Sequence, residues 1–357
     1  MNRRDFFAAA GAIAANALTA NFTARAKELP APALHTKRRL VLVCAYPKSA
    51  AGTHDVAACL ASRLERLLGG GSVQIEVRAS AMGSIDALTS GGAHMTLAGE
   101  GANVGRIPAL AFVSGLPGRF AHDPNFAEGW LTGSGQRLWH QAHQETGLLP
   151  LYAGSQGVSP GIWSRRPISS FSGLKIAAAP GPRADVLSAL GTQTTPLAPA
   201  DYADALSSGA VDAVELSSLE DAIALGVARA APYCLDSALA PHAGPLALTF
   251  APSLWHGLPQ AVRTAVRQDI LAFAAHRQVR ACENEDALKA ALSAAFGCAF
   301  QQLNTAKIAT IDRLSEAIIA DYASRNSACR ALGGAAMATM FAGRETDTTS
   351  THYVNAV

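Results

Sequence analysis

The sequence lacks a marked excess of charge of either sign. Of its 357 residues only 16% are charged, and the formal net charge is +2. A chain so close to neutral has no electrostatic field that would favour nucleic acid or an anionic membrane surface. We therefore expect neither of them as a partner.

Closely spaced cysteines and long hydrophobic runs are absent as well. The six cysteines include no Cys-x-x-Cys pair and no spacing typical of a zinc site. A disulfide among Cys282, Cys298 and Cys329 stays open, because an oxidising compartment would permit one. Beyond the N-terminal stretch no hydrophobic run is long enough to cross a membrane. The sequence thus favours neither a metal-binding module nor an integral membrane protein.

The first 26 residues have the pattern of a twin-arginine export signal. Arg3 and Arg4 precede a weakly apolar, Ala-rich stretch, and the small-x-small cleavage site Ala24-Arg25-Ala26 ends it. We expect residues 1–26 to be removed on export and the remaining protein to lie in the periplasm.

Short apolar runs alternate with segments of helical periodicity along most of the chain. The expected strands are residues 39–45, 73–77, 94–98, 148–153, 161–163, 174–179 and 211–216, and the expected helices are residues 55–68, 84–89, 183–190, 202–207, 219–226, 261–290 and 305–324. This order predicts an α/β fold built on open, mostly parallel sheets flanked by helices. From residue 260 onward the pattern is almost entirely helical.

Three blocks in the middle of the chain carry a family resemblance. They are Gly154-Ser-Gln-Gly-Val158 with Gly161-Ile-Trp163, Ser170-Phe-Ser-Gly-Leu-Lys-Ile176, and Leu206-Ser-Ser-Gly-Ala-Val-Asp-Ala-Val-Glu215. These blocks resemble the substrate-binding proteins of TRAP transporters, of the DctP type. The early Tyr46-Pro47-Lys48-Ser49 is similar to a motif of the branch that binds 2-oxo acids. The resemblance runs in register over about residues 39–259.

The resemblance implies a two-lobed, periplasmic-binding-protein-like clamshell. One lobe would contain residues 38–150 and 243–280 and the other residues 151–242 and 281–340, with a long helix spanning both. Ligand would bind between the lobes at the carboxyl ends of strands, and the lobes would close around it. The implied protein is no enzyme: it captures a small organic acid, a 2-oxo monocarboxylate being favoured, for the small and large TRAP membrane subunits. A homodimer is left open.

Most of the family's ligand positions are changed in this chain. The arginine that holds the substrate carboxylate is replaced by Ala177. Ser155 and Ser159 stand for the family's Asn and Gln, and Gly99-Glu-Gly-Ala-Asn103 stands for its aromatic box. Glu215 remains, and the 2-oxo-acid branch places this residue near a bound sodium ion. Glu215 is therefore the candidate metal ligand, no other cofactor is expected, and the identity of the ligand stays unpredicted.

Arg183 is the best substitute for the missing arginine. It lies six residues after Ala177 in the first turn of an expected helix. Free N–H groups at that end of a helix also favour an anion. The alternative is an ordinary solvated arginine on a helix surface.

Several further side chains are candidates for the cleft. Glu100 follows a strand and is expected to face the cleft by the strand-end rule. The resemblance implies that Ser155 and Ser159 are ligand residues, by their place in the family motif. Trp163 and Tyr202 either contact ligand or belong to the core. His140 and His143 have i, i+3 spacing, but no third ligand accompanies them. We expect them on a solvated helix face.

Two alternative functions stay open. One is a related protein that binds or senses a solute without a transporter. The other is a secreted serine hydrolase, because Gly157-Val158-Ser159-Pro160-Gly161 fits the nucleophile motif G-x-S-x-G. The residue after the nucleophile has to donate its N–H to the oxyanion hole, and Pro160 has none. This disfavours the hydrolase.

Overall fold

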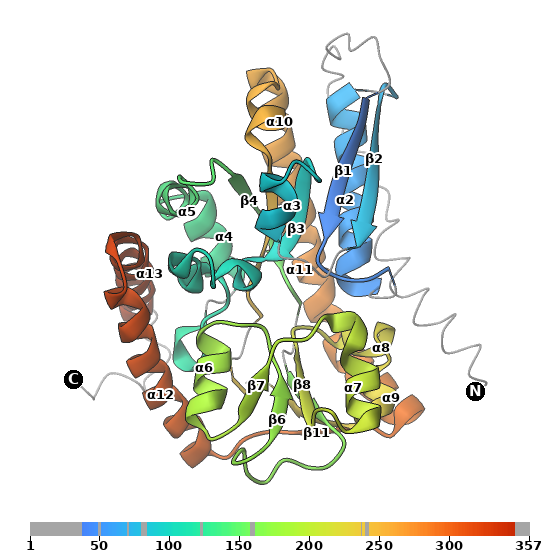
Figure 1. Cartoon of the computed structure of the whole chain (residues 1–357), viewed down its shortest axis with the longest axis vertical. Coiled ribbons are helices and arrows are strands. Elements are labelled where there is room, and N and C mark those ends of the chain that lie inside the picture. Colours follow the sequence, from blue (N-terminus) through green and yellow to red (C-terminus); the bar gives the residue numbers. More distant parts are fainter. Residues whose placement is uncertain are drawn as a thin grey trace.

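The computed structural model describes residues 38–48, 51–69, 71–79, 84–121, 124–157, 161–236, 238–239 and 243–346. The expected export signal and the candidate Ser159 lie outside these residues. The described part of the chain forms two mixed sheets with helices around them, arranged as an upper and a lower lobe (Figure 1).

The first lobe is built on a five-stranded sheet of order β2-β1-β3-β10-β4. Its strands are β1 (Arg38–Cys44), β2 (Val73–Ala79), β3 (Met95–Gly99), β4 (Leu149–Ser155) and β10 (Pro245–Phe250). The strands β1, β2 and β3 are parallel, and β10 runs antiparallel to both β3 and β4. The sheet is therefore mostly parallel, as expected, with one reversed strand.

Helices cover both faces of this sheet, which explains the continuous apolar runs of its strands. The helices are α2 (Ala51–Gly69), α3 (Ser84–Thr89), α4 (Pro124–Thr132), α5 (Gln136–Ala142) and α10 (Pro252–His256), with the 3-10 helices η1 (Glu100–Asn103), η2 (Pro108–Val113) and η3 (Gly118–Phe120). In β1, Leu40 and Leu42 pack into one core cluster and Val41 and Val43 into another.

The second lobe is built on a six-stranded sheet of order β11-β9-β5-β8-β6-β7. Its strands are β5 (Gly161–Ser164), β6 (Lys175–Ala177), β7 (Gln193–Thr195), β8 (Ala213–Leu216), β9 (Tyr233–Asp236) and β11 (Ala299–Gln301). Only β5 runs antiparallel to its neighbours, β8 and β9. The helices of this lobe are α6 (Pro182–Ala189), α7 (Tyr202–Ser208), α8 (Leu219–Ala224) and α9 (Val227–Ala230), with the 3-10 helix η4 (Pro199–Asp201).

Three long helices at the C-terminal end connect the lobes: α11 (Gln260–Phe296), α12 (Thr305–Ser324) and α13 (Ser327–Thr346). The 37 residues of α11 extend over about 55 Å. Val266 near the start of α11 packs into the core of the first lobe, and Leu292 near its end packs into that of the second. The expected helix that spans both lobes is therefore present.

The expected limits of the lobes fall inside three elements, which are β4, α11 and α13. The limit at residue 150 falls inside β4, which pairs with β10 of the first sheet as far as Ser155. The C-terminal residues expected in the second lobe include most of α13. That helix packs against α5 and η2 of the first lobe as well as against α12 (Figure 1).

Two findings concern the cysteines and the hydrophobic character of the helices. The five cysteines whose side chains are described are all free: Cys44, Cys59, Cys234, Cys298 and Cys329. Among the described residues no helix has the length and apolar character needed to cross a membrane.

Candidate functional site

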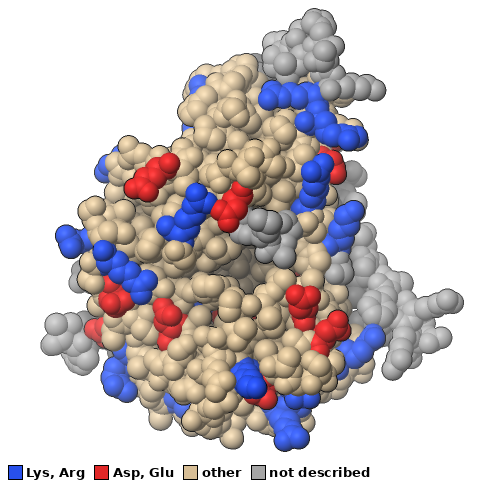
Figure 2. Space-filling model, viewed as in Figure 1, with Lys and Arg blue, Asp and Glu red and all other residues tan. Residues whose placement is uncertain are grey.

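A cavity of about 380 Å³ lies between the two lobes. Figure 2 shows a hollow in the middle of this face, with the charged side chains scattered around it. The first lobe lines the cavity with residues 45–46, 98–99, 101–102 and 114–115, and the second with residues 179–183, 196–199, 202 and 215–217. Residues 45–46, 98–99, 179–183, 196–199 and 215–217 end or follow β1, β3, β6, β7 and β8. The cavity thus lies at the carboxyl ends of strands, where open α/β sheets bind ligands.

Arg183 and Glu215 are the only charged side chains among the described residues that line this cavity. Arg183 comes from the first turn of α6 and Glu215 from β8. Nη2 of Arg183 lies 2.5 Å from Oε1 of Glu215, and the two side chains are only 12% and 10% exposed. Because the charges are opposite, the cavity wall has no net charge.

Both members of this pair have hydrogen-bonding capacity left. Nε of Arg183 is buried and donates no hydrogen bond. Oε1 of Glu215 touches the guanidinium but accepts no hydrogen bond of good geometry. Buried polar atoms are almost always hydrogen-bonded in folded proteins. A buried donor and a buried acceptor that lie side by side without hydrogen bonds are therefore typical of a site for a polar ligand.

Two tyrosines from opposite lobes complete the polar part of the cavity wall. Tyr202 begins α7, and burial together with the Glu215 carboxylate raises its pKa. Tyr46 follows β1, and burial raises its pKa well above the ordinary value, helped by nearby Asp221 and Tyr202. Both phenols are therefore neutral at physiological pH and can donate a hydrogen bond.

Two glycines shape the backbone around the cavity. Gly181 has a φ of +137°, a conformation that other residues rarely adopt, and it allows the sharp turn from β6 into α6 that places Arg183. A Cβ atom on Gly99 would lie 1.9 Å from Nε2 of Gln156. The absence of a side chain at Gly99 lets Gln156 reach across the cavity floor.

Residues that cross between the lobes lie directly beneath the cavity. The N–H of Gln156 donates to the carbonyl of Gly244, and Oε1 of Gln156 accepts a hydrogen bond from Ser217. Thr53 at the start of α2 donates through Oγ1 to Asp221 of α8 at 3.1 Å. Backbone crossings and the buried contact between Thr53 and Asp221 therefore both join the two lobes.

The model of the bacterial extracellular solute-binding proteins of family 7, DctP, matches residues 51–326. This chain belongs to that family. The DctP match covers the second sheet, the first sheet except β1, and α11. It also covers all the described residues named above on the cavity wall except residues 45–46, which precede it.

Known proteins resemble this DctP chain in sequence and in fold. It is 32% identical over 134 residues to the monocarboxylate 2-oxoacid-binding periplasmic protein of Nostoc sp., and the match covers 36% of each chain. A TRAP transporter solute-binding protein from Bordetella bronchiseptica, with calcium and picolinate, superposes with a TM-score of 0.77 at 20% identity, over 88% of this chain and 95% of the other. A TRAP periplasmic protein from Pseudoalteromonas atlantica, with sodium and pyruvate, gives 0.75 at 20% identity, over 88% and 97%.

Of the residues expected in the site of this DctP protein, the structure brings Arg183, Tyr202 and Glu215 together on the cavity wall. Trp163 does not line the cavity. It is fully buried and packs edge-on against Phe300, in agreement with the core alternative.

Ser155 does not line the cavity either, because its hydroxyl turns back to the carbonyl of Gly157 at 2.8 Å. Ala177, where the family has its arginine, is fully buried in the core of the second lobe.

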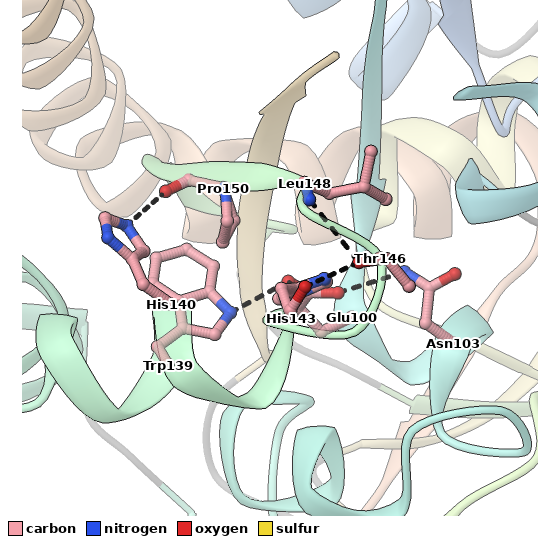
Figure 3. A network of polar contacts seen from close by, with 8 residues as sticks. All are labelled: Glu100, Asn103, Trp139, His140, His143, Thr146, Leu148 and Pro150. Atoms are coloured by element: carbon pink, nitrogen blue, oxygen red, sulfur yellow. Dashed lines mark hydrogen bonds and ion pairs between the residues drawn. The ribbon is translucent and has the colours of Figure 1, made fainter. Parts of the chain in front are cut away.

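Glu100 does not line the cavity, contrary to the expectation that it faces the cleft. Its side chain points toward Trp139, His143 and Asn103 (Figure 3). It is only 1% exposed, and its carboxylate accepts hydrogen bonds from Trp139 at 2.8 Å and Asn103 at 2.9 Å and contacts Nε2 of His143 at 2.9 Å. The turn η1 directs the side chain inward while the neighbouring Gly99 and Gly101 keep their place on the cavity wall.

The two histidines also differ from the expectation of a solvated helix face. His143 is completely buried against Glu100, and His140 is half-buried with Nε2 2.9 Å from the carbonyl of Pro150. Burial by itself would raise the pKa of Glu100, but His143 and the hydrogen bonds outweigh this and lower it. Glu100 is therefore a structural anion that holds α5 to the turn behind the cavity.

The residues of the cavity wall that were not predicted from the sequence include Tyr46, Gln156 and Ser217. Tyr46 could have been predicted from the sequence, because the strand-end rule that selected Glu100 applies equally to the residues after β1. Gln156 and Ser217 gave no comparable signal, because their meeting depends on how the two lobes are joined.

Proposed function

We propose that this protein is the periplasmic solute-binding receptor of a TRAP transporter. It captures a small organic acid in the cavity between its lobes and delivers it to the small and large membrane subunits. The observation that carries the proposal is the mostly buried Arg183 beside Glu215 in a cavity between the lobes of a DctP-family fold. Family members and neighbours of known structure are solute-binding proteins, so we propose capture and release without a chemical step.

The composition of the cavity wall favours a ligand with one carboxylate. Arg183 is the only cationic side chain among the described lining residues, and one guanidinium binds one carboxylate in a two-pronged arrangement. The partial relative that binds monocarboxylate 2-oxo acids supports the same choice. A dicarboxylate would leave its second charge facing Glu215 or the apolar wall.

The cavity does not fit the metal ion that accompanies the ligand in two of the similar structures. Calcium requires six to eight oxygen ligands and usually several carboxylates. Here Glu215 is the only carboxylate on the described wall, so the wall supplies far fewer oxygen ligands than a calcium ion requires. No group of three His, Cys, Asp or Glu suited to an ion occurs among the described residues. We assign no role to an ion at Glu215.

We also propose how the protein reaches its place and how its lobes are divided. Export through the twin-arginine pathway is supported by the sequence pattern of residues 1–26, in which Arg3 and Arg4 precede an Ala-rich stretch and the cleavage site Ala24-Arg25-Ala26. The lobes would divide after Ser155 and before Pro245, because β4 ends and β10 begins there and the segments between them cross. The C-terminal helices belong to both lobes.

A thermal-shift screen of the purified protein tests the proposed function. The panel contains monocarboxylates with hydrogen, oxo, hydroxy and amino groups at C2, together with dicarboxylates and neutral sugars. We expect at least one monocarboxylate to raise the melting temperature with saturation, because a ligand that binds only the folded state stabilises it. A protein that responds to neutral sugars alone, or to nothing in the panel, would refute the proposal.

A further inference from the structure

We infer that the acid taken by this cavity is a zwitterion, a small α-amino acid whose carboxylate binds Arg183 and whose ammonium group binds Glu215. The inference rests on the proposed function and names the chemical class of its ligand. It differs from the 2-oxo acid that the partial relative suggests. It is carried by the hydrogen-bonding capacity, the charge and the apolar surface of the cavity.

Hydrogen bonding distinguishes the two kinds of acid. The buried Nε of Arg183 needs an acceptor, and Oε1 of Glu215 needs a donor. A 2-oxo acid has only acceptor atoms, so it would satisfy Nε of Arg183 but donate nothing to Oε1 of Glu215, which contacts the guanidinium without a hydrogen bond of good geometry. Leaving a buried polar atom without a hydrogen bond is costly. An α-amino acid has an acceptor and a donor on adjacent carbon atoms, which matches the adjacent donor and acceptor on the protein.

The charge count favours the same ligand. Arg183 and Glu215 cancel, and no other charged side chain lines the described wall. A lone carboxylic acid would bring a net negative charge into a closing cavity, where an unpaired charge is strongly disfavoured. The cavity wall offers too few oxygen ligands for a metal ion, so a bound cation would not balance this negative charge. A zwitterion adds no net charge, and its two groups can face Arg183 and Glu215 so that opposite charges alternate.

The apolar residues that the second lobe places on the wall favour an apolar side chain on the ligand. The second lobe contributes Pro180, Pro196, Leu197, Pro199 and Leu216 to the lining. None of these side chains can hydrogen-bond with a polar substituent. We therefore expect an aliphatic amino acid to bind better than one with a charged or amide side chain.

Isothermal titration calorimetry on matched acids tests the inference. Leucine, 4-methyl-2-oxopentanoate and 2-hydroxy-4-methylpentanoate have one carbon skeleton and differ only at C2, and alanine, pyruvate and lactate form a second, smaller series. The full-length exported protein is titrated in potassium buffer with a chelator. We expect the amino acid of at least one series to bind at least tenfold more tightly than its oxo and hydroxy analogues.

The other outcomes separate the inference from the proposed function. Preference for a 2-oxo acid, with or without added calcium or sodium, overturns the zwitterion and leaves the receptor intact. Preference for a 2-hydroxy acid shows that Glu215 needs a donor but no charge, and it also overturns the inference. If neither amino acid binds while another acid of the screen does, the inference fails alone. If no acid binds at all, the proposed function fails.

The variant Glu215→Gln tests the contact with the ammonium group. Glutamine has the same shape and can still accept a hydrogen bond from Arg183, but it has no charge. We expect leucine to bind at least tenfold more weakly, and the affinity for 4-methyl-2-oxopentanoate to stay or rise because Arg183 is released. Glu76→Gln is the matched control, since Glu76 pairs with Arg78 on the exposed surface of β2. An equal loss for both acids would mean that Glu215 only supports Arg183, and would overturn the assignment.

Discussion

Arg183 and Glu215 depend on each other for their place in the cavity. A charge that is mostly buried is tolerated when its partner lies within contact distance, here 2.5 Å. The sequence favoured Arg183 as a ligand residue because it starts a helix near the lost arginine. Its partner Glu215 could not be predicted from spacing, because α6 and β8 meet only through the order of the strands in the second sheet.

Replacing Arg183 by Met tests this mutual dependence. We expect at least tenfold weaker binding of any acid found in the screen, about 1.4 kcal/mol or more. The variant should also unfold more easily, by roughly 3 kcal/mol, because Glu215 then remains buried without its partner. Urea denaturation measures the loss. The double variant Arg183→Met with Glu215→Gln should recover most of it, and a double variant as unstable as the single one would show that the pair contributes no coupling.

Glu100 shows that the strand-end rule predicts which turn lies beside the cavity but not where a side chain of that turn points. The rule identified the turn after β3 correctly as part of the site. The side chain points the other way because Trp139 and His143, some forty residues later, offer it buried donors. No pattern near Glu100 in the sequence indicates that Trp139 and His143 are its partners.

The lowered pKa of Glu100 leads to a pH-dependent prediction. Because its pKa in the folded protein lies below the ordinary value of 4.5, the ionised carboxylate stabilises the fold above that pH. The contribution is lost as the pH falls through the lowered pKa. Glu100→Gln should cost about 1–3 kcal/mol at neutral pH. The difference from the wild type in urea denaturation should shrink below pH 4.5, and a difference that is constant with pH would contradict the role of the charge.

At the scale of elements, helices and strands with strong periodicity were predictable and short or late strands were not. The helix α12 lies where its pattern predicted it, at Thr305–Ser324. The strand β10 was missed, although its burial is complete, because it joins the first sheet after the chain has passed through most of the second lobe. The strand β11 has only three residues and carries no pattern of its own.

The contact between β4 and α11 gives a prediction at this scale. Gly154 has a φ of +101°, and a Cβ atom there would lie 3.3 Å from Cβ of Ala274, which is 2% exposed. Ala274→Leu should therefore destabilise the protein by about 1–3 kcal/mol through overpacking. Ala275→Leu is the control, because Ala275 is exposed on the same turn of α11. Similar unfolding midpoints for the two variants would show that the contact has room to adjust.

At the scale of the whole molecule, one buried contact joins the lobes at the side of the cavity. Asp221 of α8 accepts hydrogen bonds from the backbone N–H and the hydroxyl of Thr53 in the first turn of α2. Burial raises the pKa of Asp221 from 3.8 to about 6, although Ser218 and Thr53 oppose this by hydrogen bonding. The carboxyl group therefore takes up a proton as the pH falls through about 6.

The raised pKa fixes the sign of the last prediction. The folded protein binds a proton at Asp221 between about pH 4 and pH 6, where the unfolded chain has already lost it, so stability falls as the pH rises through this window. A shift of this size corresponds to roughly 3 kcal/mol. Asp221→Asn keeps the shape and can still exchange hydrogen bonds with Thr53, but it does not titrate. We expect its free energy of unfolding to lack the decline between pH 4 and pH 6, and to exceed that of the wild type at pH 8.

Because the contact bridges the lobes, X-ray scattering should show the variant no more open than the wild type at pH 8. A variant with the same pH slope as the wild type would mean that other groups govern it, and a more open variant would mean that the charge of Asp221 holds the lobes together.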